Sequence, residues 1–314
     1  MRTFSRTIAE AERRRSIRLP TLEDAPALLM ASDSSGSHRA SSHLVHAFLI
    51  ADPRTMSSWD SWRSAVRGRW LADGRRISYK SLGDRQQRAA LPGFLGAAAT
   101  ICGALVVLAV DKRLGSLFAE RPRLRNPEFP RWQAATLDKA LVLIHLASLL
   151  LAGFSADGQD VLWISDEDDF VADDQRLADF VKAFAWVSSH YLPHRLRHLR
   201  IGTTRSDTGR RDVEDLVAIP DLVAGAWGGL LQAYRAEGTG LSRVIAPAPR
   251  RLPVKANEVL TWFLKGGALC RVAFEICASR GGDGLTVQRL VLHQLGDTIL
   301  APGWCPLGRR PAGH

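Results

Sequence analysis

The sequence predicts an α/β protein with a mixed sheet, flanking helices and a small C-terminal α+β extension. Two strand-like runs near the start form a predicted hairpin, and apolar strands then alternate with helical patterns. The 314 residues allow one large domain or two modest ones. With 46 % hydrophobic and 24 % charged residues, the composition excludes a wholly disordered chain.

The opening hairpin follows from apolar runs and turn residues. An apolar run at 28–32 ends at the turn signal Asp33-Ser34-Ser35-Gly36, and alternation at 43–51 predicts the partner strand. Residues 59–70 place tryptophans on one side of a helix and arginines on the other. The next predicted elements are an extended piece at 77–82, a helix at 84–100, a strand at 105–110, a helix at 132–154, a strand at 161–165, a helix at 176–189, a strand at 199–203 and a helix at 220–235 with Pro220 in its first turn.

The chain divides into three predicted segments. Residues 1–24 form an arginine-rich leader that we expect to be flexible, and residues 25–236 form the α/β domain. Residues 237–314 comprise a linker rich in Gly, Pro and Arg and a C-terminal extension. In this extension, 257–263 predict a helix, and 271–277 with 285–293 predict a hairpin around Gly281-Gly282-Asp283-Gly284.

The charge balance favours a polyanionic partner. The net charge is +10, and the isoelectric point is near 10.1. Such an excess fits nucleic acid, RNA or DNA, better than an anionic membrane surface. The candidate contacts to the nucleic-acid backbone are arginines around 63–76, 121–131 and 195–211. A bias toward arginine can, however, also come from genome composition alone.

Two uncharged stretches raise the alternative of a membrane protein. Residues 89–110 and 140–156 contain no charge, but glycines and a proline interrupt the first, and the second is short for a span. Both are better explained as core elements. The leader lacks the apolar region of a secretory signal, and four scattered cysteines without a Cys-x-x-Cys motif fit a reducing compartment. We therefore expect a cytoplasmic protein.

Acidic residues follow several predicted strands. Asp33, Asp111 and Asp166 each end a strand, and Asp221 lies at the start of the last predicted helix of the domain. Residues at the carboxyl ends of strands can converge on one site in an open α/β sheet. Converging carboxylates repel one another, and Mg²⁺ or Mn²⁺ neutralises them through oxygen ligands. For each aspartate taken alone, turn chemistry or helix capping is the better explanation of its position.

Five stretches between residues 28 and 234 occur in a fixed order. They are Ala31-Ser32-Asp33-Ser34-Ser35-Gly36 with His46-Ala47-Phe48-Leu49-Ile50; Ile77-Ser78-Tyr79-Lys80-Ser81-Leu82; 105–112, ending in Asp111-Lys112; 161–167, ending in Asp166-Glu167; and Ser206 with Ile219-Pro220-Asp221-Leu222-Val223-Ala224-Gly225-Ala226. In this order they resemble the bacterial "domain of unknown function 3800" family, whose members look ribonuclease-H-like.

The resemblance implies a ribonuclease-H-like fold and a metal-dependent nuclease, a hydrolase of phosphodiesters. It implies that Asp33, Asp166 and Asp221 hold Mg²⁺ or Mn²⁺, with Glu167 and Asp111 as second choices. Lys80 and Lys112 would contact phosphate or orient a carboxylate, and a surface salt bridge explains each lysine equally well.

The chain departs from the family pattern at three places. Ser34 replaces the acid that follows the first aspartate, Pro220 replaces an alanine, and the helix after Lys80 carries no glutamate. A catalytically degenerate module that binds nucleic acid or protein is therefore the alternative function.

Two further patterns have simpler explanations. His190, His194 and His198 recur every four residues, but Pro193 and neighbouring arginines favour a basic surface over a zinc site. The Trp59, Trp62 and Trp70 stripe favours core packing over base stacking.

Overall fold

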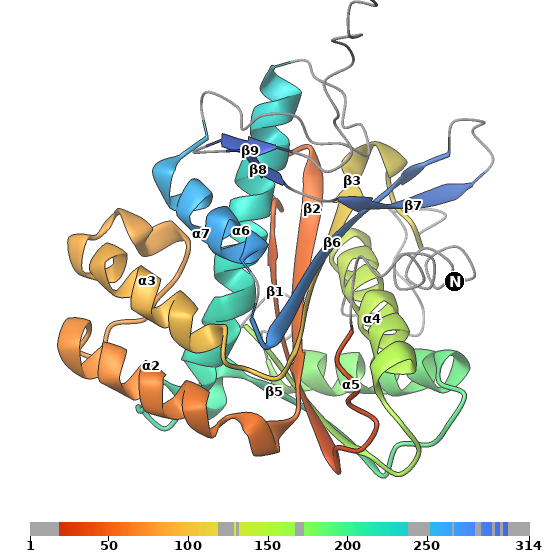
Figure 1. Ribbon diagram of the computed structural model, residues 1–314. Helices are drawn as coiled ribbons and strands as arrows, with labels where there is room; N and C mark the ends of the chain where they lie inside the picture. The colour runs from red at the N-terminus through yellow and green to blue at the C-terminus, as the bar shows by residue number, and fades with distance from the viewer. Residues whose placement is uncertain are drawn as a thin grey trace, which may run out of the picture.

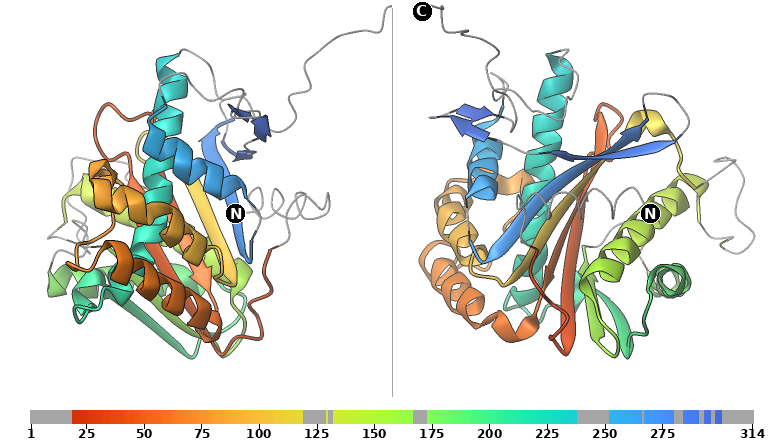
Figure 2. Two further views of the ribbon diagram at one scale, coloured as in Figure 1. Left: turned by 60° about the vertical axis from the view of Figure 1, so that its left-hand side comes forward. Right: turned by 45° about the vertical axis from the view of Figure 1, so that its right-hand side comes forward.

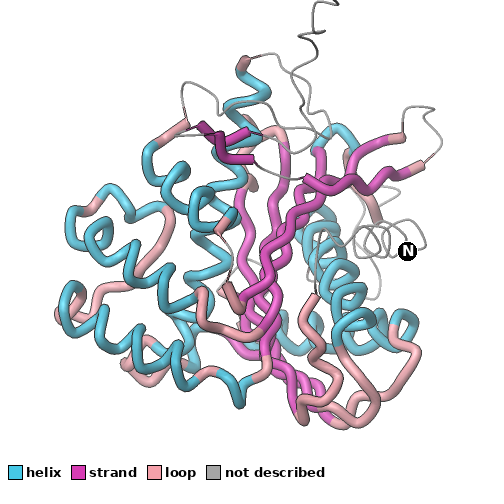
Figure 3. Tube along the Cα trace, viewed as in Figure 1, coloured by secondary structure: helices cyan, strands magenta, loops and turns pink. Residues whose placement is uncertain are grey.

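The protein is built in three layers, a central sheet with helices on both faces (Figure 1). The computed structural model describes residues 19–118, 129, 132–166, 173–237, 252–265, 267–279 and 284–290, together with the backbone of 293–295 and 298–300. After an opening hairpin, strands alternate along the chain with single helices or pairs of helices. Figure 3 shows the helices flanking the strands. The predicted α/β class with a mixed sheet is confirmed.

Seven strands of the described residues form one mixed sheet in the order β5-β4-β1-β2-β3-β6-β7. Their bounds are β1 Ala27–Ser35, β2 His43–Ala51, β3 Gly103–Asp111, β4 Asp160–Ser165, β5 His198–Thr203, β6 Leu269–Ala278 and β7 Leu285–Leu290. β2 and β7 run antiparallel to their neighbours, and the other adjacent pairs are parallel. A separate two-stranded sheet contains β8 (His293–Leu295) and β9 (Thr298–Leu300).

Six helices of the described residues cover the sheet. They are α2 Ser57–Trp70, α3 Arg85–Ala98, α4 Ala134–Phe154, α5 Asp174–Tyr191, α6 Asp212–Ala236 and α7 Val254–Leu264. α2, α3, α6 and α7 lie on one face and α4 and α5 on the other (Figure 2). Each face has its own apolar core, because strand side chains alternate between the two faces.

One edge of the sheet gathers the ends of most strands. β1, β3, β4, β5 and β6 run in the same direction, so their last residues share this edge, which we name the carboxyl edge. Because β2 runs the opposite way, its first residue, His43, also lies there, paired with Asp111. Side chains from distant parts of the sequence therefore meet at the carboxyl edge.

Two predicted elements are wrong. The segment 77–82 is not extended but ends in a short 3₁₀ turn, Lys80–Gly83, because the Ser81 hydroxyl bonds the Ser78 backbone. The last helix of the domain begins at Asp212 rather than at Pro220, which lies in its interior. Acidic residues favour the earlier start, and packing on the sheet offsets the hydrogen bond that the proline removes.

The ends of the predicted domain are also more closely packed than expected. Leu22, assigned to the flexible leader, is buried, and the Gln159 side-chain amide donates to its carbonyl oxygen. Residues 1–18 and most of the predicted linker lie outside the described residues. The predicted C-terminal helix and hairpin are α7, β6 and β7, and β6 joins the main sheet beside β3.

Two helices, α4 and α6, are long and apolar enough to cross a membrane by length and composition. Most of each helix is buried in the fold, as is common for core helices. This is weak evidence for membrane spans.

Candidate functional site

Asp33 and Asp166 lie side by side at the carboxyl edge. Ser32 of β1 pairs with Ser165 of the parallel neighbour β4, and each aspartate directly follows its serine. Neighbouring strands are about 4.8 Å apart. Asp33 shares the sheet face of Ala31, which packs in the core beneath α6. The strand register therefore presents two carboxylates together on the side that α6 covers.

Asp221 reaches the same place from α6. Its carboxyl group shares a hydrogen bond with that of Asp33, and its Oδ2 accepts from the backbone N–H of Tyr79 at 2.7 Å. Burial raises the pKa of Asp221, and the nearby charge of Asp166 acts in the same direction. We name Asp33, Asp166 and Asp221 the acid triad.

Tyr79 is held against the acid triad by two glycines of α6. A Cβ on Gly225 would lie 2.3 Å from the Tyr79 ring, and one on Gly229 would lie 3.4 Å from its hydroxyl. Both follow Asp221 at four-residue intervals, so they share its helix face. Lys255 completes the packing, with Nζ 4.4 Å from the ring centroid and 2.9 Å from the Tyr79 carbonyl oxygen. The small residues thus place the Tyr79 amide on the Asp221 carboxylate.

A cation of the protein itself already binds the acid triad. The Arg76 guanidinium donates to Asp166 Oδ2 at 2.5 Å, and its charge also acts on Asp221. Although burial lowers the pKa of Arg76, its hydrogen bond to Asp166 and the acidic charges raise it overall. The Thr204 hydroxyl donates to Asp166 Oδ1 at 2.9 Å. Arg76 therefore offsets part of the negative charge of the acid triad.

The other predicted site residues are not part of the acid triad. Glu167 lies outside the described residues. Lys80 is exposed on the 3₁₀ turn, and Lys112 donates to the carbonyl oxygen of His38 at 2.7 Å, which ties the loop after β1 to the end of β3. Asp111 is buried two strands from Asp33, so it belongs to a different part of the carboxyl edge.

Asp111 instead joins a second polar group. His43, Asp111 and Glu275, from β2, β3 and β6, each offer a ligand atom, and these atoms lie within 4.8 Å of one another. His43 Nε2 is 3.1 Å from Glu275 Oε1. The sequence placed Asp111 at a strand end but contained no local signal for its two partners, because the strands that supply them are far apart in the chain.

Some of the predicted nucleic-acid contacts are wrong. Arg63 and Arg67 of α2 are buried, and both bind Asp215 of α6, at 3.0 and 2.5 Å. Of the Trp59, Trp62 and Trp70 stripe, Trp59 packs in the core, but Trp62 is 57 % exposed. The buried arginines face another helix because α2 packs on the fold through them.

The three spaced histidines are not gathered. His194 Nε2 lies 2.8 Å from the Ser155 hydroxyl, His198 bonds Asp160, and His190 bonds the Trp186 carbonyl oxygen. Each ring therefore has its own local partner.

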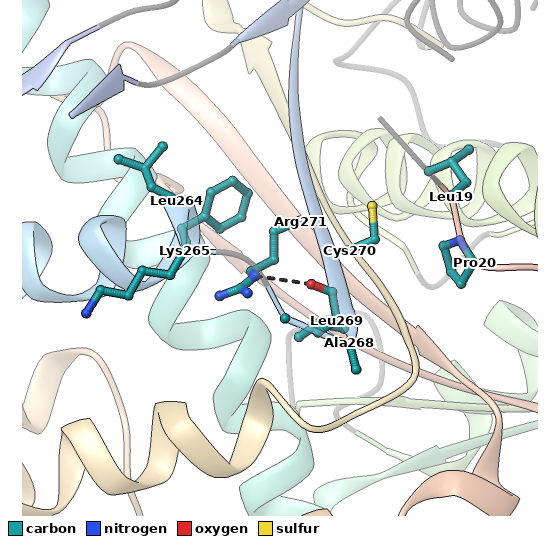
Figure 4. A pocket seen from close by; sticks show the side chains of 10 residues that line it. Leu19, Pro20, Leu264, Lys265, Ala268, Leu269, Cys270 and Arg271 are labelled. Carbon is teal, nitrogen blue, oxygen red and sulfur yellow. Dashed lines mark hydrogen bonds between the residues drawn. The ribbon is translucent and has the colours of Figure 1, made fainter. Parts of the chain in front are cut away.

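A pocket of about 440 Å³ opens at the opposite edge of the sheet, where β6 begins. Leu19, Pro20 and Cys270 line one side and Leu264 and Arg271 the other (Figure 4). The Arg271 guanidinium lies 4.5 Å from the Trp262 ring centroid and donates to the carbonyl oxygen of Leu269. Burial lowers the pKa of Arg271 to about 10. The pocket contains no member of the acid triad.

Sequence reasoning missed Arg76, Tyr79 and Thr204 as parts of the site. Thr204 could have been found, since it follows β5, the parallel neighbour of β4, at the carboxyl edge. Arg76 and Tyr79 lie before the 3₁₀ turn Lys80–Gly83 and not at the end of a strand, so the convergence of strand ends could not identify them. A scan against protein-family models and a search of curated proteins found no match to this chain.

Proposed function

We propose that the protein is a nuclease that hydrolyses phosphodiesters with Mg²⁺ or Mn²⁺ held by the acid triad. The observation that carries the proposal is the convergence of Asp33, Asp166 and Asp221 from two strands and a helix. Carboxylates are rarely gathered in this way without a positive charge to offset their repulsion. The positive net charge of the chain fits a nucleic-acid substrate.

The ligand set of the acid triad fits a hard divalent cation. It offers only carboxylate oxygens, the ligands that Mg²⁺ and Mn²⁺ prefer. Asp33, Asp166 and Asp221 would hold such ions, which would supply activation of water and stabilisation of the leaving oxygen of a phosphodiester. The residues around the triad position it: Thr204 orients Asp166, and the Tyr79 amide orients Asp221.

The order of strands supports the ribonuclease-H-like part of the proposal. An opening antiparallel hairpin, β1–β2, is extended by β3 on one side and by the parallel strands β4 and β5 on the other. This order is compatible with a ribonuclease-H-like core. The acid triad lies at the carboxyl ends of β1 and β4, where open α/β sheets bind their ligands.

Arg76 favours a second candidate function, a non-catalytic module that binds nucleic acid or a partner protein. Its guanidinium donates to the Asp166 oxygen that a cation would use, and it supplies positive charge without an ion. Ser34, at the position where the resembled family has an acid, agrees with this candidate. The two functions differ in whether a divalent ion can displace Arg76.

The test is cleavage of labelled RNA, DNA and hybrid duplexes with Mn²⁺ by the wild type and by Asp166→Asn, Arg76→Gln and two surface controls. If the nuclease proposal holds, Asp166→Asn lowers the rate roughly 100-fold or more, and Arg76→Gln tightens metal binding because a competitor is gone. Asp60→Asn and Arg85→Gln, on exposed side chains, leave both the cleavage rate and metal binding unchanged.

Calorimetric titration with Mn²⁺ separates the two candidates. The nuclease has a divalent site that Asp166→Asn removes. Absence of cleavage, together with absence of such a site in both the wild type and Arg76→Gln, would contradict the nuclease. Salt-sensitive binding of nucleic acid by the same samples would then support the binding module.

A further inference from the structure

We propose that His43, Asp111 and Glu275 form a second metal site, specific for a transition-metal ion such as Zn²⁺, that fastens β6 to the core of the sheet. This inference does not rest on the proposed function. The three residues come from β2, β3 and β6, which are consecutive neighbours in the sheet.

The strand register brings these three side chains together. His43 pairs with Asp111 across β2 and β3, and Glu275 pairs with Ala109, two residues before Asp111. Because side chains alternate along a strand, all three share one face of the sheet. One ligand atom from each lies within 4.8 Å of the others. This is the spacing of atoms that can surround one ion.

A second shell of polar groups orients each ligand. The Ser42 hydroxyl lies 2.9 Å from His43 Nδ1, which leaves Nε2 toward Glu275. The Gln288 side-chain amide donates to Glu275 Oε2, and the Arg113 backbone N–H donates to Asp111 Oδ1 at 2.9 Å. In metal sites, partners of this kind fix the ring orientation of histidine and the position of carboxylates.

The two buried carboxylates of this group share one permanent positive charge, that of Arg113. His43 is 5 % exposed, and Asp111 and Glu275 are each 2 % exposed. Two buried carboxylates face Arg113 and a histidine that is positive only when protonated. Arg113 is itself a solvent-facing side chain, 77 % exposed, so it can leave Asp111 without being buried elsewhere. A divalent ion would supply the missing charge in its place.

The ligand set distinguishes this site from the acid triad. One imidazole nitrogen and two carboxylate oxygens suit Zn²⁺ and similar ions, whereas Mg²⁺ prefers oxygen alone. The ligands are buried on one face of the sheet and come from three neighbouring strands, so the ion would have a structural role. It would join β6, from the C-terminal part of the chain, to the opening hairpin.

The test is metal analysis and calorimetry on the full chain without an affinity tag, stripped with a chelator and titrated with Zn²⁺. We expect one Zn²⁺ per chain in the wild type. Glu275→Gln and His43→Gln should each weaken this binding at least about tenfold. Asp166→Asn should bind Zn²⁺ like the wild type, which separates this site from the acid triad.

Arg113→Gln gives a second test that does not disturb the buried residues. Because Arg113 competes with the ion for Asp111, its removal should tighten Zn²⁺ binding by up to about fivefold, the range of an exposed ion pair. If Arg113 merely holds a metal-free network together, affinity falls or does not change, and this result counts against the proposal.

The melting temperature checks that each variant is folded. Zn²⁺ should raise the melting temperature of the wild type and of Asp166→Asn but not that of Glu275→Gln. The proposal is overturned if the folded wild type binds no Zn²⁺, or if Glu275→Gln and His43→Gln bind it as the wild type does. If Glu275→Gln does not fold, Zn²⁺ binding by the wild type and by Arg113→Gln decides the test.

Discussion

The buried histidine His46, on the opening hairpin, makes the stability of the fold depend on pH. His46 of β2 is 2 % exposed, its Nδ1 lies 2.7 Å from the Ser34 hydroxyl, and its Nε2 has no hydrogen-bond partner among the described residues. Burial lowers the pKa of His46 from 6.5 to about 4. A charged ring cannot be solvated in this position, so His46 is neutral in the folded protein.

This gives a prediction for the pH dependence of stability. Between pH 6.5 and about 4 the unfolded chain binds a proton at His46 and the folded chain does not, so the free energy of unfolding falls as pH falls. The total loss from this residue is about 3 kcal/mol, and it is complete below pH 4. It is measured by urea unfolding at several pH values.

The variants isolate this effect from other titrating groups. His46→Phe should lack about 3 kcal/mol of the decline between pH 6.5 and 4, whereas His38→Gln, at an exposed histidine, should retain all of it. If wild type and His46→Phe lose stability equally over this range, the assignment to His46 is wrong.

At the scale of elements, a buried ion network joins α2 to α6. Asp215, in the first turn of α6, accepts from Arg63 at 3.0 Å and from Arg67 at 2.5 Å, and Asp212 also binds Arg63. Arg63, Arg67 and Asp215 are buried, whereas the Asp212 side chain is 45 % exposed. Removing one member leaves charges buried without partners, which costs far more than losing an exposed pair.

Asp215→Asn should therefore lower the free energy of unfolding by about 3–5 kcal/mol. Asp60→Asn is the matched control, since Asp60 is largely exposed and only 4.0 Å from the same Arg63; its effect should stay below about 1 kcal/mol. Both values come from denaturant unfolding. Similar losses of unfolding free energy in the two variants would show that the buried network stabilises the fold no more than an exposed ion pair does.

The packing of Tyr79 on α6 predicts the effect of one methyl group. A Cβ at Gly225 would lie 2.3 Å from the Tyr79 ring, so Gly225→Ala must displace the ring and with it the amide that binds Asp221. We expect a loss of about 1–3 kcal/mol in unfolding free energy. Weaker Mn²⁺ binding at the acid triad should accompany it.

Gly153 of α4 is the control for this substitution. A Cβ there would meet nothing within 4 Å, so Gly153→Ala should be neutral or stabilise the helix by up to about 1 kcal/mol. An equal loss of unfolding free energy in Gly225→Ala and Gly153→Ala would point to a backbone effect. The contact with Tyr79 would then not explain the loss at Gly225.

At the scale of the whole molecule, the sheet continues past the predicted domain boundary. β6 pairs with β3 from Gly103↔Leu269 to Val110↔Ile276, so it covers the edge of the most buried strand of the fold. Side chains of α7 belong to the same core as α2, α3 and α6. The C-terminal segment is thus part of the same sheet as the acid triad and the His43, Asp111 and Glu275 group.

A chain cut after residue 237 should consequently aggregate. It would expose unpaired backbone along β3, with apolar side chains on both faces, which is a template for pairing between chains. Size-exclusion chromatography and light scattering measure this against the full chain. A monomeric, folded truncation would show that β6 is dispensable for the α/β core.

The sequence alone determined the elements whose signals are local. Period-two alternation and turn residues predicted β2 at its observed bounds. Asp33, near the end of β1, and Asp166, directly after β4, could be named from position alone. The 77–82 segment and the start of α6 were wrong because Ser78–Ser81 bonds and core packing outweigh local preference.

Tertiary structure decided which of these residues meet. Alternation along a strand tells which face a side chain occupies but not which strand lies beside it, so Asp111 could be placed at an edge without its partners His43 and Glu275. In the same way, only the docking of α6 on β1 brought Asp221 to Asp33. Only the path of the chain between α2 and the 3₁₀ turn set Arg76 against Asp166. Long-range register is a property of the whole sheet, and no short stretch of sequence contains it.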